Sequence, residues 1–170
     1  LDGSWHGWLA EGRPVSTRLV EPSPGTDLVV TPRPVLFIDR NELQDIHRDT
    51  TCQVWDTRRS AEYDGQEETE NQRRGHIPGA RQLAWTDLLT GDGTAGEPRY
   101  LKPRAELESL LAQLGLRRDK TIITYCQSGI RAAFCIFVLQ LLGYPNHRLY
   151  DASMGQWCQL GETPLTTEST

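Results

Sequence analysis

Short apolar runs alternate with longer segments along most of this chain, and the two kinds of segment predict different elements. Runs of three to five residues suit buried strands, whereas the longer segments have lengths typical of helices. Strands are expected over Val35–Ile38, Cys52–Asp56, Arg81–Ala84, Thr121–Tyr125 and Arg148–Tyr150. Helices or single helical turns are expected over Arg40–His47, Ser60–Tyr63, Trp85–Leu89, Arg104–Leu114 and Ile130–Leu142.

The order of these elements predicts the fold class. Asp39 is suited to cap the helix that follows it, Pro103 fits the start of the helix after it, and Gly115 fits that helix's end. Strands that alternate with helices form parallel βαβ units. The chain is therefore predicted to be α/β, with an open, mostly parallel five-stranded sheet and helices on both faces. In such a sheet ligands bind outside the carboxyl ends of the strands.

Two segments at opposite ends of the chain share a pattern. Aligned over twelve positions, residues 1–12 and 150–161 match at an Asp, a Ser, a Trp and a Gly. A repeated pattern indicates two copies of one structural unit. We therefore expect residues 1–20 to be the tail of a preceding homologous domain. Residues 21–34, rich in Pro, Ser, Gly and Thr, are expected to be a linker, and residues 35–166 the second domain.

Composition and charge argue against several classes of function. The 170 residues carry 18 Lys and Arg against 23 Asp and Glu, a net charge of −5 at pH 7. Because no basic stripe is present, nucleic acid is not an expected partner. No apolar stretch is long enough to cross a membrane. The four histidines lack metal-ligand spacing, and neither a metal nor another cofactor is expected.

The four cysteines divide into one candidate for chemistry and three packing residues. Cys52 opens a predicted strand, Cys135 lies inside a predicted helix and Cys158 follows Trp157 in a short segment. No two cysteines form a C-x-x-C pair. Cys126 lies between a predicted strand and a predicted helix. Backbone N–H groups and the helix N-terminus should therefore point at its sulfur. Such an environment stabilises a thiolate and raises its reactivity, and Arg131 adds a positive charge at the far end of the loop.

A free catalytic thiol favours a reducing compartment, so a cytoplasmic location is expected. A chain that starts at Leu1 leaves room for a targeting signal that has been removed.

Several segments together resemble the rhodanese sulfurtransferase family. Residues 55–65 and residues 75–80, which read Gly-His-Ile-Pro-Gly-Ala, are similar to its two signature stretches. Residues 126–131, which read Cys-Gln-Ser-Gly-Ile-Arg, are similar to its six-residue active-site loop. Residues 150–157 resemble the strand and turn that close the domain. The resemblance implies a rhodanese-like fold and identifies residues 1–20 as the tail of an upstream rhodanese-like domain.

The resemblance implies sulfane sulfur transfer with Cys126 as the nucleophile. Cys126 would attack the outer sulfur of a donor such as thiosulfate, become a persulfide and pass the sulfur to cyanide or a thiol. The implied partners are thus a small-molecule donor and acceptor, together with the upstream domain. The substrate-binding residues would be Gln127, Ser128, Gly129, Ile130 and Arg131.

Each part of the loop has a physical task in that scheme. Converging backbone N–H groups would stabilise the anionic persulfide. Ser128 would donate a further hydrogen bond, Gly129 would allow close backbone approach, and Arg131 would attract an anionic donor.

Four residues outside the loop also bear on the resemblance. Asp56 and Arg58 are expected to form an ion pair that holds loops together, and His76 is expected to shape a turn. Glu62 stands where two-domain thiosulfate and mercaptopyruvate enzymes often carry a donor-binding arginine. A carboxylate there would repel a dianionic donor, so the resemblance assigns the reaction class but leaves the donor open.

Two alternatives remain beside sulfur transfer. Dual-specificity phosphatases of the cell-cycle type share this fold, but their loop has five residues between Cys and Arg. Only four residues separate Cys126 from Arg131, and the shorter loop suits one sulfur atom better than a phosphate. The second alternative is a non-catalytic rhodanese module for binding or regulation. Such modules usually lack the cysteine that this chain has.

Overall fold

The computed structural model of the protein describes residues 1–21, 25, 29–159 and 161–168. Its strands are β1 (Cys52–Asp56), β2 (Arg81–Gln82), β3 (Thr121–Tyr125) and β4 (His147–Leu149). Its α-helices are α1 (Ser4–Ala10), α2 (Arg40–Ile46), α3 (Ser60–Tyr63), α4 (Arg104–Gln113), α5 (Ile130–Leu141) and α6 (Ser153–Trp157). Two 3₁₀ helices, η1 (Pro34–Leu36) and η2 (Trp85–Leu88), complete the described elements.

The strands form one parallel sheet in the order β2-β1-β3-β4. β1 and β3 pair along their whole length, from Cys52 opposite Thr121 to Asp56 opposite Tyr125. The chain therefore leaves β1 toward one edge of the sheet and leaves β3 toward the other. The point at which the strand order reverses therefore lies at the carboxyl ends of these two strands, where open parallel sheets usually bind their ligands.

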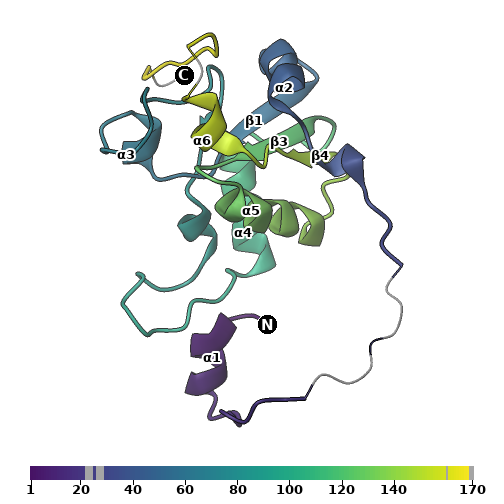
Figure 1. The fold of residues 1–170 in the computed structure, drawn as a ribbon, viewed down its shortest axis with the longest axis vertical. Coiled ribbons are helices and arrows are strands. Elements are labelled where there is room, and N and C mark those ends of the chain that lie inside the picture. The colour runs from purple at the N-terminus through teal and green to yellow at the C-terminus, as the bar shows by residue number, and fades with distance from the viewer. Residues whose placement is uncertain (22–24, 26–28, 160, 169–170) are drawn as a thin grey trace.

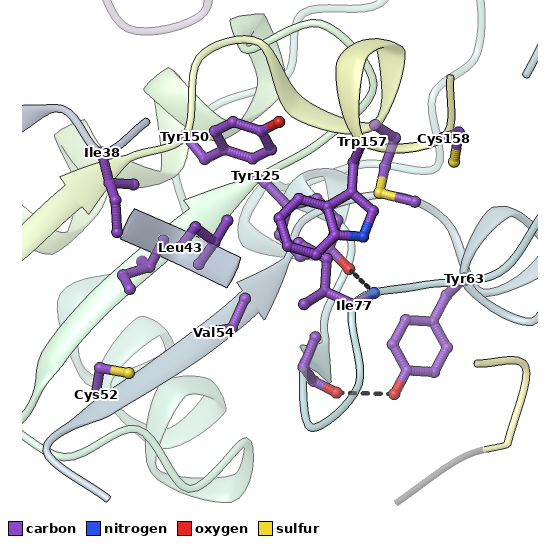
Figure 2. Packing of buried hydrophobic residues seen from close by; sticks show 13 residues of the cluster. Ile38, Leu43, Cys52, Val54, Tyr63, Ile77, Tyr125, Tyr150, Trp157 and Cys158 are labelled. Carbon is purple, nitrogen blue, oxygen red and sulfur yellow. Dashed lines mark hydrogen bonds between the residues drawn. The ribbon is translucent and has the colours of Figure 1, made fainter. Parts of the chain in front are cut away.

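Helices cover both faces of the sheet, as the sequence predicts (Figure 1). Residues of α2, α3 and α6 form one apolar cluster with alternate residues of β1 and β3, such as Val54 and Tyr125. Figure 2 shows Trp157 of α6 and Leu43 of α2 in this cluster. The residues between them on the strands, such as Trp55, face α4 and α5 in a second cluster. Burial on both faces is what keeps a parallel sheet stable.

The structure has four strands in its described residues rather than the five predicted. The expected strand over Val35–Ile38 is wrong, because Pro34 begins a 3₁₀ helix instead. Only Phe37 makes a bridge, to Leu149 at the outer edge of β4. Most of the apolar run lies outside the core, since Val35 is 72 % exposed and Phe37 is 50 % exposed, and of its residues only Ile38 joins the buried cluster beside α2. Asp39 then starts α2 at once and leaves no length for a strand.

The remaining predicted elements are present with small changes at their ends. The expected strand over Arg81–Ala84 is shortened to β2, because Trp85 begins η2. Of the predicted linker, residues 22–24 and 26–28 lie outside the described residues. None of the described helices has both the length and the apolar character needed to cross a membrane.

α1 and α6 each begin with a serine in the same unusual backbone conformation. α1 begins at Ser4 with a φ of 50°, and α6 begins at Ser153 with a φ of 51°. A left-handed conformation is uncommon for residues other than glycine. The two serines are the positions that the sequence alignment pairs.

The tryptophans of the two segments also make the same contact. Trp8 donates its indole N–H to the carbonyl oxygen of Pro14 at 3.0 Å. Trp157 donates to the carbonyl oxygen of Pro164 at 2.8 Å. The alignment of the two segments thus extends to their backbone conformation and hydrogen bonding.

Replacing Leu111 with alanine tests whether the cluster on the α4 and α5 face stabilises the fold. Leu111 is fully buried, so Leu111→Ala should lower the free energy of unfolding by about 2–5 kcal/mol, the cost of a cavity in a packed core. Urea unfolding measures this change. The matched control is Leu141→Ala, since that leucine is 48 % exposed and should cost less than about 1 kcal/mol. Equal losses for both variants would contradict the assigned core.

Candidate active site

The residues that the sequence singles out come together around the carboxyl ends of β1 and β3. β1 ends at Asp56 and continues into the loop that carries Arg58 and, in α3, Glu62. β3 ends at Tyr125 and continues directly into Cys126. Thr57 ties the two strand ends together, because its backbone N–H and its hydroxyl both donate to the carbonyl oxygen of Tyr125 at 3.0 Å.

Cys126 lies under the loop that leads from β3 into α5. Its side chain is 1 % exposed and packs with Ala132 and Leu149. The first turn of α5 begins four residues later, at Ile130. A helix of this length carries a partial positive charge at its N-terminus, where backbone N–H groups are unpaired. The position therefore favours negative charge on the sulfur.

Gly129 gives the loop its shape for two reasons. Its φ is 85°, which side-chain-bearing residues rarely adopt. A Cβ atom at this position would also lie 2.6 Å from the backbone oxygen of Asp151 and even closer to its carboxylate. The tight turn before α5 therefore requires glycine.

The start of α6 holds the other side of the loop. The backbone N–H of Cys126 donates to the hydroxyl oxygen of Ser153 at 3.1 Å. Met154 donates its N–H to the carbonyl oxygen of Cys126 at 3.1 Å, and Gly155 donates to that of Gln127 at 2.9 Å. These three hydrogen bonds fix the first two residues of the loop.

Arg131 of α5 is paired with Glu62 of α3. Its two terminal nitrogens donate to the two carboxylate oxygens at 2.7 and 2.8 Å. Glu62 is 5 % exposed, and its carboxylate also accepts the backbone N–H of Arg59 at 3.2 Å. Burial opposes ionisation of Glu62, but the hydrogen bonds from Arg131 and Arg59 outweigh it and lower the pKa of Glu62 from 4.5 to about 2.

This pairing differs from what the sequence predicts for the two charges. The sequence predicts that Arg131 attracts an anionic donor and that Glu62 repels it. In the structure the two side chains bind each other. The hydrogen bonds that Arg131 donates to Glu62, and secondarily the nearby sulfur of Cys126, raise the pKa of Arg131.

The other predicted substrate-binding residues differ in their surroundings. Gln127 exchanges two hydrogen bonds with Asn71, at 2.8 and 3.0 Å, so the amide pair joins the active-site loop to the charged loop after α3. Ser128 and Ile130 are exposed, with Ile130 at 79 %. Nothing in the sequence marks Asn71, because it lies in a polar segment whose pattern is typical of a solvated loop.

Asp56 and Arg58 form a buried ion pair, with 2.6 Å between an Asp56 carboxylate oxygen and an Arg58 terminal nitrogen. Arg58 also donates to the carbonyl oxygen of Gly75 at 2.9 Å. The pair therefore connects the loop after β1 with the segment that contains His76, which is the structural role that the sequence predicts for it.

His76 contacts the protein frame rather than the sulfur. Its ring stacks on Tyr63 with 3.4 Å between ring centroids, and its Nδ1 lies 2.9 Å from the carbonyl oxygen of Tyr63. Burial lowers the pKa of His76, so the ring is neutral at neutral pH. The backbone of His76 pairs with Thr166 in both directions.

The three remaining cysteines are free and buried. Burial raises the pKa of Cys52, Cys135 and Cys158, which makes them poor nucleophiles. Among the described residues, no group of three or more His, Cys, Asp or Glu side chains is placed to hold a metal ion.

Comparisons with known proteins place this geometry in a family. The family model for the rhodanese-like domain matches residues 39–160. Thiosulfate sulfurtransferase of Azotobacter vinelandii is 34 % identical over 97 % of this chain, which covers 58 % of that protein. 3-mercaptopyruvate sulfurtransferase of Escherichia coli K12 is 35 % identical over 69 % of this chain, which covers 40 % of that protein.

Solved structures agree with the fold. The anaerobic ergothioneine biosynthesis enzyme from Chlorobium limicola superposes with a TM-score of 0.81 at 22 % identity, over 100 % of this chain and 41 % of that one. At this level of identity the likeness concerns the fold alone. The chain spans a little more than half of the Azotobacter vinelandii protein and about two fifths of each of the other two proteins.

The Glu62–Arg131 pair predicts how stability depends on pH. The pKa of Glu62 is about 2 in the folded protein and should return to 4.5 on unfolding, so its contribution is present above pH 4.5 and is lost as the pH falls toward 2. The loss should amount to about 2–3 kcal/mol. Urea unfolding at a series of acid pH values measures it.

In the variant Glu62→Gln, the free energy of unfolding should change less between pH 4.5 and pH 2 than in the wild-type protein. Glu67→Gln is the control, because Glu67 binds Arg59 but not Arg131. If the wild-type and Glu62→Gln proteins lose stability in parallel on acidification, the pair does not stabilise the fold in this way.

Proposed function

Because the chain belongs to the family of rhodanese-like domains, we propose that it carries sulfane sulfur on Cys126 and transfers it to a thiophilic acceptor. The observation that carries the proposal is the position of Cys126. Its thiol lies at the carboxyl end of β3, at the switch point of the sheet, under a loop that runs into the N-terminus of α5.

The proposed reaction has two displacements. In the first, the Cys126 thiolate attacks the outer sulfur of a donor such as thiosulfate. A new S–S bond forms to Cys126, the S–S bond of thiosulfate breaks, and its electron pair leaves with sulfite. In the second, cyanide or a thiolate attacks the terminal sulfur of the persulfide, which returns Cys126 as a thiolate.

The loop supplies what these steps require. Negative charge rests on sulfur before the first displacement and on the persulfide between the two, and backbone N–H groups with a helix N-terminus stabilise such charge. The buried position limits water around the sulfur, which strengthens those electrostatic interactions. No cofactor takes part in this scheme.

The charges around the loop bear on the donor. Arg131 is the loop's charged side chain, and its bidentate pairing with Glu62 neutralises it. Gln127 and Ser128 add no charge. A dianion such as thiosulfate therefore gains little Coulomb attraction here. We propose small sulfane-sulfur compounds as the donor class, with thiosulfate as a competent donor that binds weakly.

The context of the domain is also a proposal. Residues 1–20 are proposed to be the tail of a second rhodanese-like unit that would be a partner of this domain. The matched serines and tryptophans of residues 1–14 and 150–164 support it. A reducing, cytoplasmic compartment stays a prediction, supported by four cysteines that are free in the structure.

Mass spectrometry after incubation with thiosulfate tests the reaction. The wild-type protein should gain one sulfur atom, and cyanide should remove it. Cys126→Ser should abolish both the gain and thiosulfate:cyanide transfer, because no other described thiol lies in the loop. Cys135→Ala is the matched control and should retain transfer. Sulfur uptake by the Cys126 variant, or hydrolysis of an aryl phosphate by a wild-type protein that takes up no sulfur, would overturn the proposal.

Steady-state kinetics of Glu62→Gln test the proposed weak binding of thiosulfate. Removing the carboxylate releases the charge of Arg131, so the KM for thiosulfate should fall by about tenfold at low salt, equivalent to about 1.4 kcal/mol. Added salt should reverse the gain, because a partly exposed charge is screened. Glu67→Gln should leave the KM unchanged. If Glu62→Gln also leaves it unchanged at low salt, the charge of Arg131 does not act on the donor.

A further inference from the structure

The contacts between α6 and the loop determine the direction of two peptide units. The carbonyl oxygen of Cys126 accepts from Met154, and that of Gln127 accepts from Gly155. Both carbonyl groups thus point toward α6. The Cys126–Gln127 and Gln127–Ser128 peptide bonds are trans. In a trans peptide the N–H points opposite to the C=O, so the N–H groups of Gln127 and Ser128 point away from α6.

Ser153 adds a third contact between α6 and the loop, to the backbone of Cys126. Its hydroxyl oxygen accepts the N–H of Cys126 at 3.1 Å and donates to the carbonyl oxygen of Tyr150 at 2.8 Å. Ser153 is fully buried and has a φ of 51°. Residues in this conformation persist when their surroundings hold them there, and they gather at functional sites. The conformation puts the Ser153 hydroxyl where it meets Cys126.

Close approach is needed at the next contact as well. A Cβ atom on Gly155 would lie 3.1 Å from the carbonyl oxygen of Gln127, which is tighter than nine in ten contacts of real Cβ atoms, so the Gln127 peptide would have to move slightly. Glycine therefore lets α6 come near enough to bind the loop.

We propose that Ser153 and Gly155 are positioning residues, which turn the loop peptides so that the N–H groups of Gln127 and Ser128 face the sulfur of Cys126. The inference rests on the proposed sulfur transfer for its biological meaning. It concerns the reactivity of the thiol, however, which is measurable without any sulfur donor. Neither residue touches the reacting atoms in this role.

The chain provides a matched control for Ser153. Ser4 begins α1 with a φ of 50°. α1 lies against another part of the protein, since the Asp2 carboxylate accepts the backbone N–H of Leu101 and Gly3 lies against Tyr100. Glycine adopts positive φ without strain. Ser153→Gly and Ser4→Gly therefore relieve the same backbone conformation, but only the first removes a contact to Cys126.

The experiment is alkylation of the full chain by iodoacetamide over a range of pH, with the modified cysteine identified by peptide mass spectrometry. Ser153→Gly should slow alkylation of Cys126 at neutral pH by about three- to tenfold, the effect of losing one hydrogen bond. The pH profile should move to higher pH, because the loop would stabilise the thiolate less. Ser4→Gly should match the wild-type protein in both respects.

Gly155→Ala separates reactivity from stability. Alanine favours a helix over glycine, which offsets the cost of the close contact, so thermal unfolding of this variant should occur near the wild-type temperature. Its Cβ atom would nevertheless push the Gln127 peptide, and Cys126 should react more slowly with its pH profile moved the same way. A purely structural role would instead move stability and reactivity together.

The outcomes distinguish a positioning role for Ser153 and Gly155 from a purely structural role. The inference is overturned if Ser153→Gly and Gly155→Ala keep the wild-type pH profile, or if reactivity falls only in proportion to the folded fraction. Should Ser153→Gly fail to fold, the result for Gly155→Ala decides alone. If the wild-type protein takes up no sulfur from thiosulfate, the proposed function fails, while the alkylation comparison still tests the positioning role.

Discussion

The parallel pairing of β1 with β3 is the constraint on which the site depends. Its register sets Asp56 opposite Tyr125, so the two strands end at the same level. The chain then leaves the two ends in opposite directions, since β2 and β4 lie on opposite sides of this pair. The site therefore lies at a topological switch point of the sheet. The loop of Cys126 follows β3 and the segment with Arg58 and Glu62 follows β1, so the register of the two strands places these segments beside each other.

Charged side chains at the site are paired with each other, and each pair connects separate segments. Arg58 binds Asp56 and also the backbone of Gly75. Arg131 in α5 binds Glu62 in α3. A buried charge without a partner is strongly destabilising, so neither pair is easily broken from one side. The same arrangement that holds the loops leaves little free charge for a substrate.

The closing segment of the domain acts on the site through backbone groups. α6 has only five residues, yet its first three contact the first two residues of the loop. Such contacts depend on an unusual backbone conformation at Ser153 and on the missing side chain at Gly155. The loop is thus shaped from two directions, by Gly129 at the start of α5 and by α6 beneath it.

The sequence by itself determined the fold class, the position of the thiol and most element boundaries. Apolar runs and capping residues act locally, so β1, β3, α4 and α5 could be predicted from residues close in the chain. The strand predicted from the apolar run after Pro34 is absent, because contacts with distant parts of the chain decided which of its residues are buried. Only the tertiary structure decided that Arg131 and Glu62 neutralise each other, that Gln127 binds Asn71 and that Ser153 holds Cys126. These partners are 69, 56 and 27 residues apart, and no local propensity encodes which side chains meet when distant segments fold together.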